Sequence, residues 1–476
     1  MNRRAFLKTL GTGALAGAAS GCLSAGARRG AAPKTNVLLV LVDDLGRQDL
    51  GCYGNTHIDT PTMDRLAAEG MRFTDAYSSC PVCSPTRAAL LTGKSTARVH
   101  FTGHITAIGK HRHPEHSAII PPDDLMYIPH DEVTLAEALT PAGYTSISIG
   151  KWHVGHEGYY PTDQGFDSNV GGWTHGSPPS YWDPYTSDKA WNPAIPTLES
   201  RVEGEYLTDR LTDEAIAFMR EHQDRTFFCY LPHYAVHTPL QAPPELVEKY
   251  RQKKNLHIDP VYAAMVERVD QGLARILGEL DALGLADNTA VILASDNGAL
   301  ETVADNRPFR RGKGHLYEGG LRVPLIVRWP RHVKPGAVCR TPTLSEDLYA
   351  TIVDLAGAEA RPGAPLDGRS LKGELTGAGN LGERDLHWYY PHYSPQAQEP
   401  GAAIRAGTWK LIEFYDPPRH ELYNLEEDLG ETRNLAAEQP DRVKELADRL
   451  HAWLEDAGTI MHTENPEAAL DPRTGV

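Results

Sequence analysis

Two pairs of oxygen-bearing side chains follow strongly apolar segments of the chain. Asp43 and Asp44 come directly after the apolar run 37–42, and Asp296 and Asn297 end a second such run. Three carboxylates and an amide oxygen, with no histidine beside them, suit a hard cation such as Ca²⁺ or Mg²⁺ better than zinc. Either pair alone is also typical of a turn or a helix cap, but two pairs in matching positions favour a cation site.

A cysteine and an arginine stand one helical turn apart in the segment 83–87, which reads Cys-Ser-Pro-Thr-Arg. Pro85 suits the first turn of a helix, so Cys83 is expected at a helix N-terminus, where backbone N–H groups favour an anion. The guanidinium of Arg87 can reach back to the same place. Cys80 and Cys83 also have the spacing of a dithiol or zinc pair, but the chain holds no second Cys-x-x-Cys.

The segments around these residues alternate between expected strands and expected helices. Continuous apolar runs predict buried parallel strands, and stripes with steps of three or four residues predict helices that cover them. The apolar runs predict strands at 37–42, 227–231 and 290–294, and a further short strand is expected at 146–149. The helices are expected at 60–70, 85–91, 207–219 and 259–283. This order predicts a large, doubly wound, mainly parallel α/β sheet flanked by helices, with ligands at the carboxyl ends of its strands.

The pattern changes beyond about residue 375. Hairpin strands are expected at 403–405, 409–414 and 422–425, followed by a helix that starts at Pro440. We therefore expect a catalytic domain at 35–375 and a small C-terminal α+β domain with an antiparallel sheet at 376–476, after a leader at 1–34.

The segment around Cys83, followed by Leu-Leu-Thr-Gly at 90–93, resembles the signature of the type I sulfatases of the alkaline phosphatase superfamily. The resemblance covers most of residues 36–330 and continues more weakly into the last hundred. It implies an alkaline-phosphatase-like fold and an enzyme that hydrolyses sulfate esters. In this family a maturation enzyme converts the cysteine to formylglycine, whose hydrate attacks sulfur and then expels sulfate as the carbonyl forms again.

Further segments at 150–155, 235–239 and 313–320 are similar to the other motifs of that family, in the same order. The resemblance implies that Ca²⁺, or alternatively Mg²⁺, is held by Asp43, Asp44, Asp296, Asn297 and the modified Cys83. It also implies that sulfate is bound by Arg87, Lys151 and Lys313. We expect Asp296 to act as base for the hydrate, His237 as general acid, and His153 as an aid to hemiacetal breakdown.

Two aromatic segments are candidates for contacts with the substrate. Trp173 and His175 lie in a Gly-rich stretch of the kind that stacks on sugar rings, and His387 and His392 lie in a segment that could close over the crevice. Core packing explains Trp388 in that second segment equally well. Together with the export signal expected at the start of the chain, these loops favour a soluble sulfated glycan as substrate.

The 476 residues carry 47 Lys+Arg against 63 Asp+Glu, for a formal charge of −16. This acidic balance argues against a nucleic-acid partner, which needs a surplus of basic residues on some face. The start of the chain, with Arg3, Arg4 and a short apolar run, resembles a twin-arginine export signal and is too short for a transmembrane helix. We expect a periplasmic or cell-surface protein; the lipobox-like segment before Cys22 leaves a lipid anchor as the alternative.

Two other functions use the same residues. A phosphonate or phosphodiester hydrolase could employ the same formylglycine, and a glycan-binding relative could keep the fold without catalysis. Turnover of aryl sulfates against aryl phosphates, and the effect of Cys83→Ala, distinguish these alternatives.

Overall fold

The computed structural model describes residues 34–106, 113–114, 117–254, 256–360, 365–397 and 399–468. The expected export signal and Cys22 lie outside these residues. The centre of the described chain is an eight-stranded sheet with the strand order β10-β2-β9-β8-β1-β7-β5-β6. Its four central parallel strands are β8 (Thr289–Ser295), β1 (Asn36–Val42), β7 (Phe227–Pro232) and β5 (Thr145–Ile149).

The outer strands of the sheet are short. They are β6 (Ser168–Val170), β9 (Leu325–Arg328), β2 (Met71–Phe73) and β10 (Ala337–Cys339). Strand β9 runs antiparallel to both of its neighbours, β8 and β2, whereas the other pairings are parallel. The sheet is therefore mixed and mainly parallel, as the sequence predicts.

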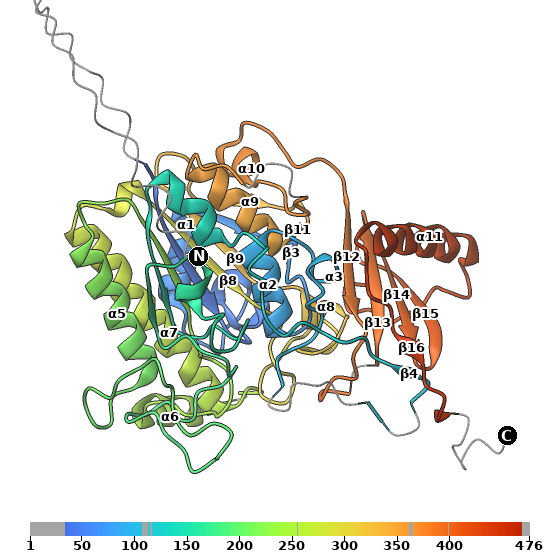
Figure 1. Cartoon of the computed structure of the whole chain (residues 1–476), viewed down its shortest axis with the longest axis horizontal. Helices are drawn as coiled ribbons and strands as arrows, with labels where there is room; N and C mark the ends of the chain where they lie inside the picture. Colours follow the sequence, from blue (N-terminus) through green and yellow to red (C-terminus); the bar gives the residue numbers. More distant parts are fainter. Residues whose placement is uncertain are drawn as a thin grey trace, which may run out of the picture. The chain divides into compact units, whose positions relative to one another are not determined.

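Helices cover both faces of this sheet, as Figure 1 shows. Along β1, alternate side chains join two different cores. One core includes α1 (Pro61–Glu69), α5 (Leu207–Glu221), α6 (Pro244–Arg251) and α7 (Pro260–Ala282). The other includes α2 (Cys83–Thr92), α4 (Leu135–Leu139), α9 (Glu346–Leu355) and α10 (Lys372–Thr376). Because neither face of β1 meets water, its sequence is a continuous apolar run without alternation.

Local sequence signals set the ends of the helices that position the site. Helix α7 begins after Asp259, whose carboxylate accepts hydrogen bonds from the backbone N–H groups of Val261 at 2.7 Å and Tyr262 at 3.3 Å. Helix α2 begins at Cys83, two residues before Pro85, and ends at Gly93, which adopts the left-handed conformation with φ 71°. Cys83 is therefore fixed at the first turn of a buried helix.

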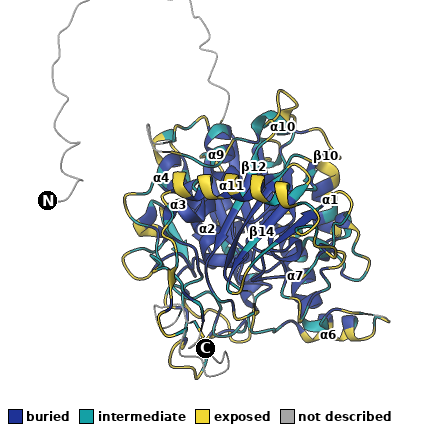
Figure 2. Ribbon diagram, turned by 90° about the vertical axis from the view of Figure 1, so that its right-hand side faces the viewer, coloured by how far each residue is buried: buried dark blue, intermediate teal, exposed yellow. Residues whose placement is uncertain are grey.

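The C-terminal part of the described chain forms a four-stranded antiparallel sheet with α11 (Pro440–Asp456) on its outer face (Figure 2). Its strands are β12 (Asp385–Tyr390), β13 (Gly401–Ala406), β14 (Trp409–Tyr415) and β15 (Pro418–Asn424). The inner face packs Leu386, Trp388 and Tyr390 against Tyr77 and Leu316 of the main body.

This arrangement corrects the expectation that the segment around His387 closes over the crevice. Residues 385–390 are a strand enclosed between α11 and the main body, so the ring of Trp388 is completely buried and its Nε1 donates to the Ser78 carbonyl oxygen at 2.8 Å. The aromatic residues of this strand form core rather than a lid.

Shorter elements complete the described chain. They are β3 (Ala76–Tyr77), β11 (Thr343–Leu344), β4 (Ile119–Ile120), β16 (Thr463–Glu464), α3 (Thr96–Val99) and α8 (Glu318–Leu321), with 3₁₀ turns at Arg47–Asp49, Gly51–Tyr53, Thr140–Ala142, Pro161–Gln164 and Ala286–Asn288. Across the part of the chain that the structure describes, no helix has the length and apolar character required to cross a membrane.

Candidate active site

The four oxygen-bearing side chains predicted from the sequence meet at the carboxyl ends of β1 and β8. These strands are neighbours in register, with Val42 opposite Ser295, so the residues that follow them are adjacent. The Nδ2 atom of Asn297 donates to Asp44 Oδ1 at 2.8 Å, and the backbone N–H of Asp44 donates to Asp296 Oδ1 at 3.2 Å. Asp43 completes the group.

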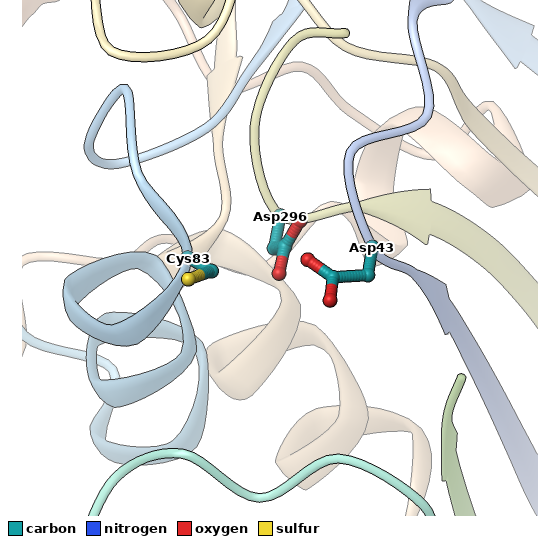
Figure 3. A group of neighbouring side chains, drawn as sticks. All are labelled: Asp43, Cys83 and Asp296. Carbon is teal, nitrogen blue, oxygen red and sulfur yellow. The ribbon is translucent and has the colours of Figure 1, made fainter. Parts of the chain in front are cut away.

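Cys83 joins this group from the first turn of α2, as Figure 3 shows with Asp43 and Asp296. The sulfur of Cys83 and one carboxylate oxygen from each of these two aspartates all lie within 4.8 Å of one another. Two oxygens of the group, Asp43 Oδ1 and Asn297 Oδ1, are buried and have no hydrogen-bond partner among the described residues. Buried acceptors without donors are costly, so these residues fit a divalent cation bound through oxygen.

Three buried cationic side chains face the three carboxylates. Lys151 Nζ lies 2.7 Å from Asp43 Oδ2, Lys313 Nζ lies 2.8 Å from Asp44 Oδ2, and Arg87 Nε lies 2.8 Å from Asp296 Oδ2. Arg87 also donates to the carbonyl oxygen of Lys151 at 2.7 Å, which ties α2 to the loop after β5. The formal charges of these six groups cancel, so a dication here would leave a positive site for an anionic substrate.

Burial and neighbouring charges shift the aspartate pKa values in opposite directions. Burial raises the pKa of Asp43 well above its ordinary value, although Lys151 acts to lower it. Burial also acts to raise the pKa of Asp44 and of Asp296, but neighbouring cations outweigh it and lower both: Lys313 first for Asp44, and Arg87 first for Asp296. Asp44 and Asp296 therefore stay ionised, and ionised carboxylates are ligands for a divalent cation.

His153 contacts the nucleophile position directly. Its Nδ1 atom lies 3.3 Å from Cys83 Sγ and 3.0 Å from Ser84 Oγ. The backbone of His153 has φ 58°, a left-handed conformation that turns its ring toward α2. Burial, with Lys151 and Arg87, lowers the pKa of His153 well below its ordinary value, so the ring is neutral at pH 7 in the ligand-free site.

His237 lies on the other side, after β7. Its Nε2 atom is 3.9 Å from Asp44 Oδ2, and its Nδ1 atom lies 2.9 Å from the Thr238 carbonyl oxygen, to which it donates. Burial and the charge of Lys313 lower the pKa of His237 to about 3. A bound anion near this ring would favour its protonated form.

A cavity of about 620 Å³ opens above Cys83. Its lining includes Cys83, His153, His237 and Lys313, and the rest comes from Val82, His104, Ile105, Thr106, His175, Gly176, Ser177, Trp191, Pro395 and Gln396.

Of the four residues predicted to contact the substrate, two lie at the cavity or directly behind it and two lie elsewhere. His175 lines the cavity, and Trp173 is buried behind it with the two ring centroids 4.4 Å apart. The structure does not bring the other two to this cavity. The ring of His387 stacks on Trp453 at 4.8 Å because alternate side chains of β12 face α11, and His392 is buried with its Nε2 2.8 Å from Thr102 Oγ1.

Sequence reasoning missed Ser84, His104, Trp191 and Gln396. Ser84 is adjacent to Cys83 and could have been found by its position on the first turn of α2. Trp191 stands in a polar stretch without helical or strand periodicity, where a large apolar residue has no core to join; that is the signal that could have identified it.

The structure combines a mainly parallel sheet, a cluster of oxygen-bearing side chains at the ends of two adjacent central strands, and a cysteine at a facing helix N-terminus. These features define a hydrolase of the alkaline phosphatase-like superfamily. Within it the model of the sulfatase family matches residues 35–358, and the chain belongs to this family. It is a type I sulfatase, a sulfuric ester hydrolase. A second model, N-sulphoglucosamine sulphohydrolase, C-terminal, matches residues 311–459.

Sequence similarity to other sulfatases agrees with this assignment. A sulfatase of Formosa agariphila is 31% identical over 94% of both chains. The N-acetylgalactosamine-6-sulfatase of Sus scrofa is 36% identical over 76% of this chain and 69% of its own, and the steryl-sulfatase of Mus musculus is 31% identical over 89% and 82%.

Solved structures show the same architecture. Ps i-CgsB in complex with k-i-k-neocarrahexaose superposes with a TM-score of 0.77 at 28% identity, covering 93% of this chain and 97% of that one. The phosphonate monoester hydrolase of Agrobacterium radiobacter has a TM-score of 0.65 at 20% identity over 90% and 96%, which shows a shared fold.

Proposed function

We propose that this sulfatase removes sulfate from a sulfated carbohydrate, with a formylglycine made from Cys83 as nucleophile and a divalent cation, Ca²⁺ or Mg²⁺, at the oxygen cluster. The observation that carries the proposal is the position of Cys83. Its sulfur shares one small site with carboxylate oxygens of Asp43 and Asp296, and its cavity also holds His153 and His237. A thiol with only a structural role has no need of this surrounding.

The cation would be held by Asp43, Asp44, Asp296 and Asn297, with residue 83 as a further ligand; when bound, it would polarise an oxygen of the sulfate group. The formylglycine hydrate supplies one hydroxyl to attack sulfur and a second that lets the sulfate leave as the carbonyl returns.

The chain's own residues bind the anion and move the protons. Lys313 lines the cavity, and its ammonium group, with the ammonium group of Lys151 and the guanidinium of Arg87, stabilises charge that develops on the sulfate oxygens. His237 lies at the cavity wall, where it can protonate the oxygen of the leaving alcohol. His153, in contact with residue 83, can accept a proton when the second hydroxyl releases sulfate. Asp296 is the base for the first hydroxyl.

Conversion of Cys83 requires a maturation enzyme, and the fold constrains when that enzyme acts. The whole of α2 is buried, with Cys83 at 3% exposure and Arg87 fully enclosed. In the folded protein the segment 83–87 is therefore too enclosed to enter the active site of another enzyme. We propose that conversion precedes folding. If the chain leaves the cytoplasm folded through a twin-arginine route, conversion must also precede export.

We also propose that the catalytic domain ends at residue 375 and the C-terminal domain begins at residue 376. A separate proposal concerns residues 1–34, which direct export to the periplasm or cell surface, with a lipid anchor at Cys22 as the alternative. Replacement of Arg3 and Arg4 by lysine should retain the protein in the cytoplasmic fraction. An unchanged distribution would contradict a twin-arginine signal.

The experiment that tests the proposed function compares the purified wild-type chain with Cys83→Ala and with the control Cys229→Ala, a cysteine buried in β7 away from the site. The wild-type chain and Cys229→Ala should hydrolyse an aryl sulfate, and Cys83→Ala should not. Mass spectrometry of the wild-type peptide should show an aldehyde at residue 83. Preference for an aryl phosphonate or phosphodiester, or full activity of Cys83→Ala, would contradict the proposal.

A further inference from the structure

One tryptophan is exposed at the mouth of the cavity. Trp191 is 50% exposed. All eight tryptophans of the chain lie in described segments, and the other seven are buried or half-buried. Trp191 lines the same cavity as Cys83 and His237. Lys189 Nζ lies 5.6 Å from the centroid of the Trp191 ring. A singly exposed aromatic ring is common on protein surfaces, but this one shares the cavity of residue 83, and that position points to substrate binding.

The ring of Trp191 is held in place by a short series of aromatic contacts that starts in the core. Trp173 is 7% exposed and packs edge-to-face on His175, with the centroids 4.4 Å apart. His175 in turn lies 5.8 Å from Trp191 in an edge-to-face arrangement, measured between ring centroids. Because these contacts exist before a ligand arrives, less conformational entropy is lost on binding.

The other walls of the cavity indicate which kind of ring would cover Trp191. Polar side chains surround the opening: His104, Thr106, Ser177 and Gln396. Gln396 is itself oriented by the hydroxyl of Ser394, which donates to its amide oxygen at 2.6 Å. A sugar offers an apolar C–H face to the aromatic ring and hydroxyl groups that can hydrogen-bond to this polar rim, whereas a steroid is apolar over nearly all of its surface.

We infer that Trp191 is the platform on which the pyranose ring of a sulfated sugar stacks, and therefore a residue that determines specificity for the alcohol part of the ester. The cavity of about 620 Å³ has the size of a small-molecule site, and its lining includes both the exposed ring of Trp191 and the buried residue 83. This inference rests on the proposed function, because it names the substrate class of the same site.

The test uses the full, converted enzyme and three substrates: the best substrate from a panel of monosaccharide sulfates, a steroid sulfate, and ethyl sulfate, which has no ring. Trp191→Ala should raise KM for the sugar sulfate about tenfold, with kcat changed less than twofold. Its kcat/KM for ethyl sulfate should stay within twofold of wild type. Trp191→Phe should recover most of the loss, because it keeps a smaller aromatic surface. Trp453→Ala, on α11 and outside the cavity lining, is the matched control and should behave as wild type.

Equal losses on the sugar sulfate and on ethyl sulfate would show a structural effect and overturn the inference. So would a loss confined to the steroid sulfate, or no change of KM for the sugar sulfate. If the wild-type enzyme hydrolysed ethyl sulfate or the steroid sulfate but no sugar sulfate, the platform would be wrong while sulfate-ester hydrolysis stood. If it hydrolysed no sulfate ester at all, the proposed function would fail first.

Discussion

Replacement of Lys151 by methionine tests whether the buried ion pair between Lys151 and Asp43 stabilises the fold. Lys151 and Asp43 are both fully buried, and their Nζ and Oδ2 atoms lie 2.7 Å apart. Methionine has nearly the same length but no charge, so Lys151→Met leaves the buried Asp43 carboxylate without its nearest cation, and Arg87 remains at 3.9 Å. Breaking a buried pair in this way costs about 3–5 kcal/mol of stability.

The control is Lys249→Met. Its ammonium group also pairs with two carboxylates, those of Asp59 at 2.7 Å and Glu267 at 2.6 Å, but its side chain is 36% exposed. A solvated pair contributes only about 0.2–1 kcal/mol. Urea unfolding followed by circular dichroism, in a chelating buffer so that no cation compensates Asp43, should therefore place the midpoint of Lys151→Met far below that of Lys249→Met. Equal midpoints for the two variants would refute the reasoning.

Two further predictions concern pH and metal. Burial, with Asp347 nearby, raises the pKa of Glu346 to about 7 in the folded protein against an ordinary value of 4.5. The folded state thus keeps a proton that the unfolded state loses, so stability should fall by about 3 kcal/mol as the pH rises from 4.5 through 7. Glu346→Gln should remove that part of the slope in unfolding curves measured from pH 4.5 to 8, and an unchanged slope would contradict it. Removal of divalent cations with a chelator should abolish aryl sulfate hydrolysis and lower the thermal midpoint, and added Ca²⁺ or Mg²⁺ should restore both; activity that survives exhaustive chelation would contradict a cation at the Asp43 cluster.

The sequence predicted those strands whose burial left a clear pattern. Strands β1, β7 and β8 have both faces covered by helices, so they appear as uninterrupted apolar runs. Strand β5 reads Thr-Ser-Ile-Ser-Ile, in which isoleucine alternates with serine. Strands β2, β9 and β10 have only three or four residues each, too few for any periodicity, and were not predicted. For the aromatic segment of β12 the sequence left a lid and core packing equally open, because both faces of this strand are buried and no alternation of polar and apolar residues distinguishes them.

The same reasoning explains which site residues could be located. Asp43 and Asp296 follow buried strands that pair directly, so elementary sheet geometry brings them together. The contact between His153 and Cys83 depends on a left-handed backbone conformation that no local pattern indicates. The placement of Trp191 beside the cavity arises from a long irregular segment held by tertiary contacts, which sequence periodicity does not encode.

The central claim is that residue 83, carried by α2, and the four oxygen donors at the ends of β1 and β8 form one reaction centre. A crystal structure of the matured enzyme with calcium and sulfate tests it most directly. We predict a cation within about 2.3–2.6 Å of oxygens from Asp43, Asp44, Asp296 and Asn297, an aldehyde or its hydrate at residue 83, and sulfate between them. An unmodified thiol at residue 83 with the cation bound elsewhere would contradict the account.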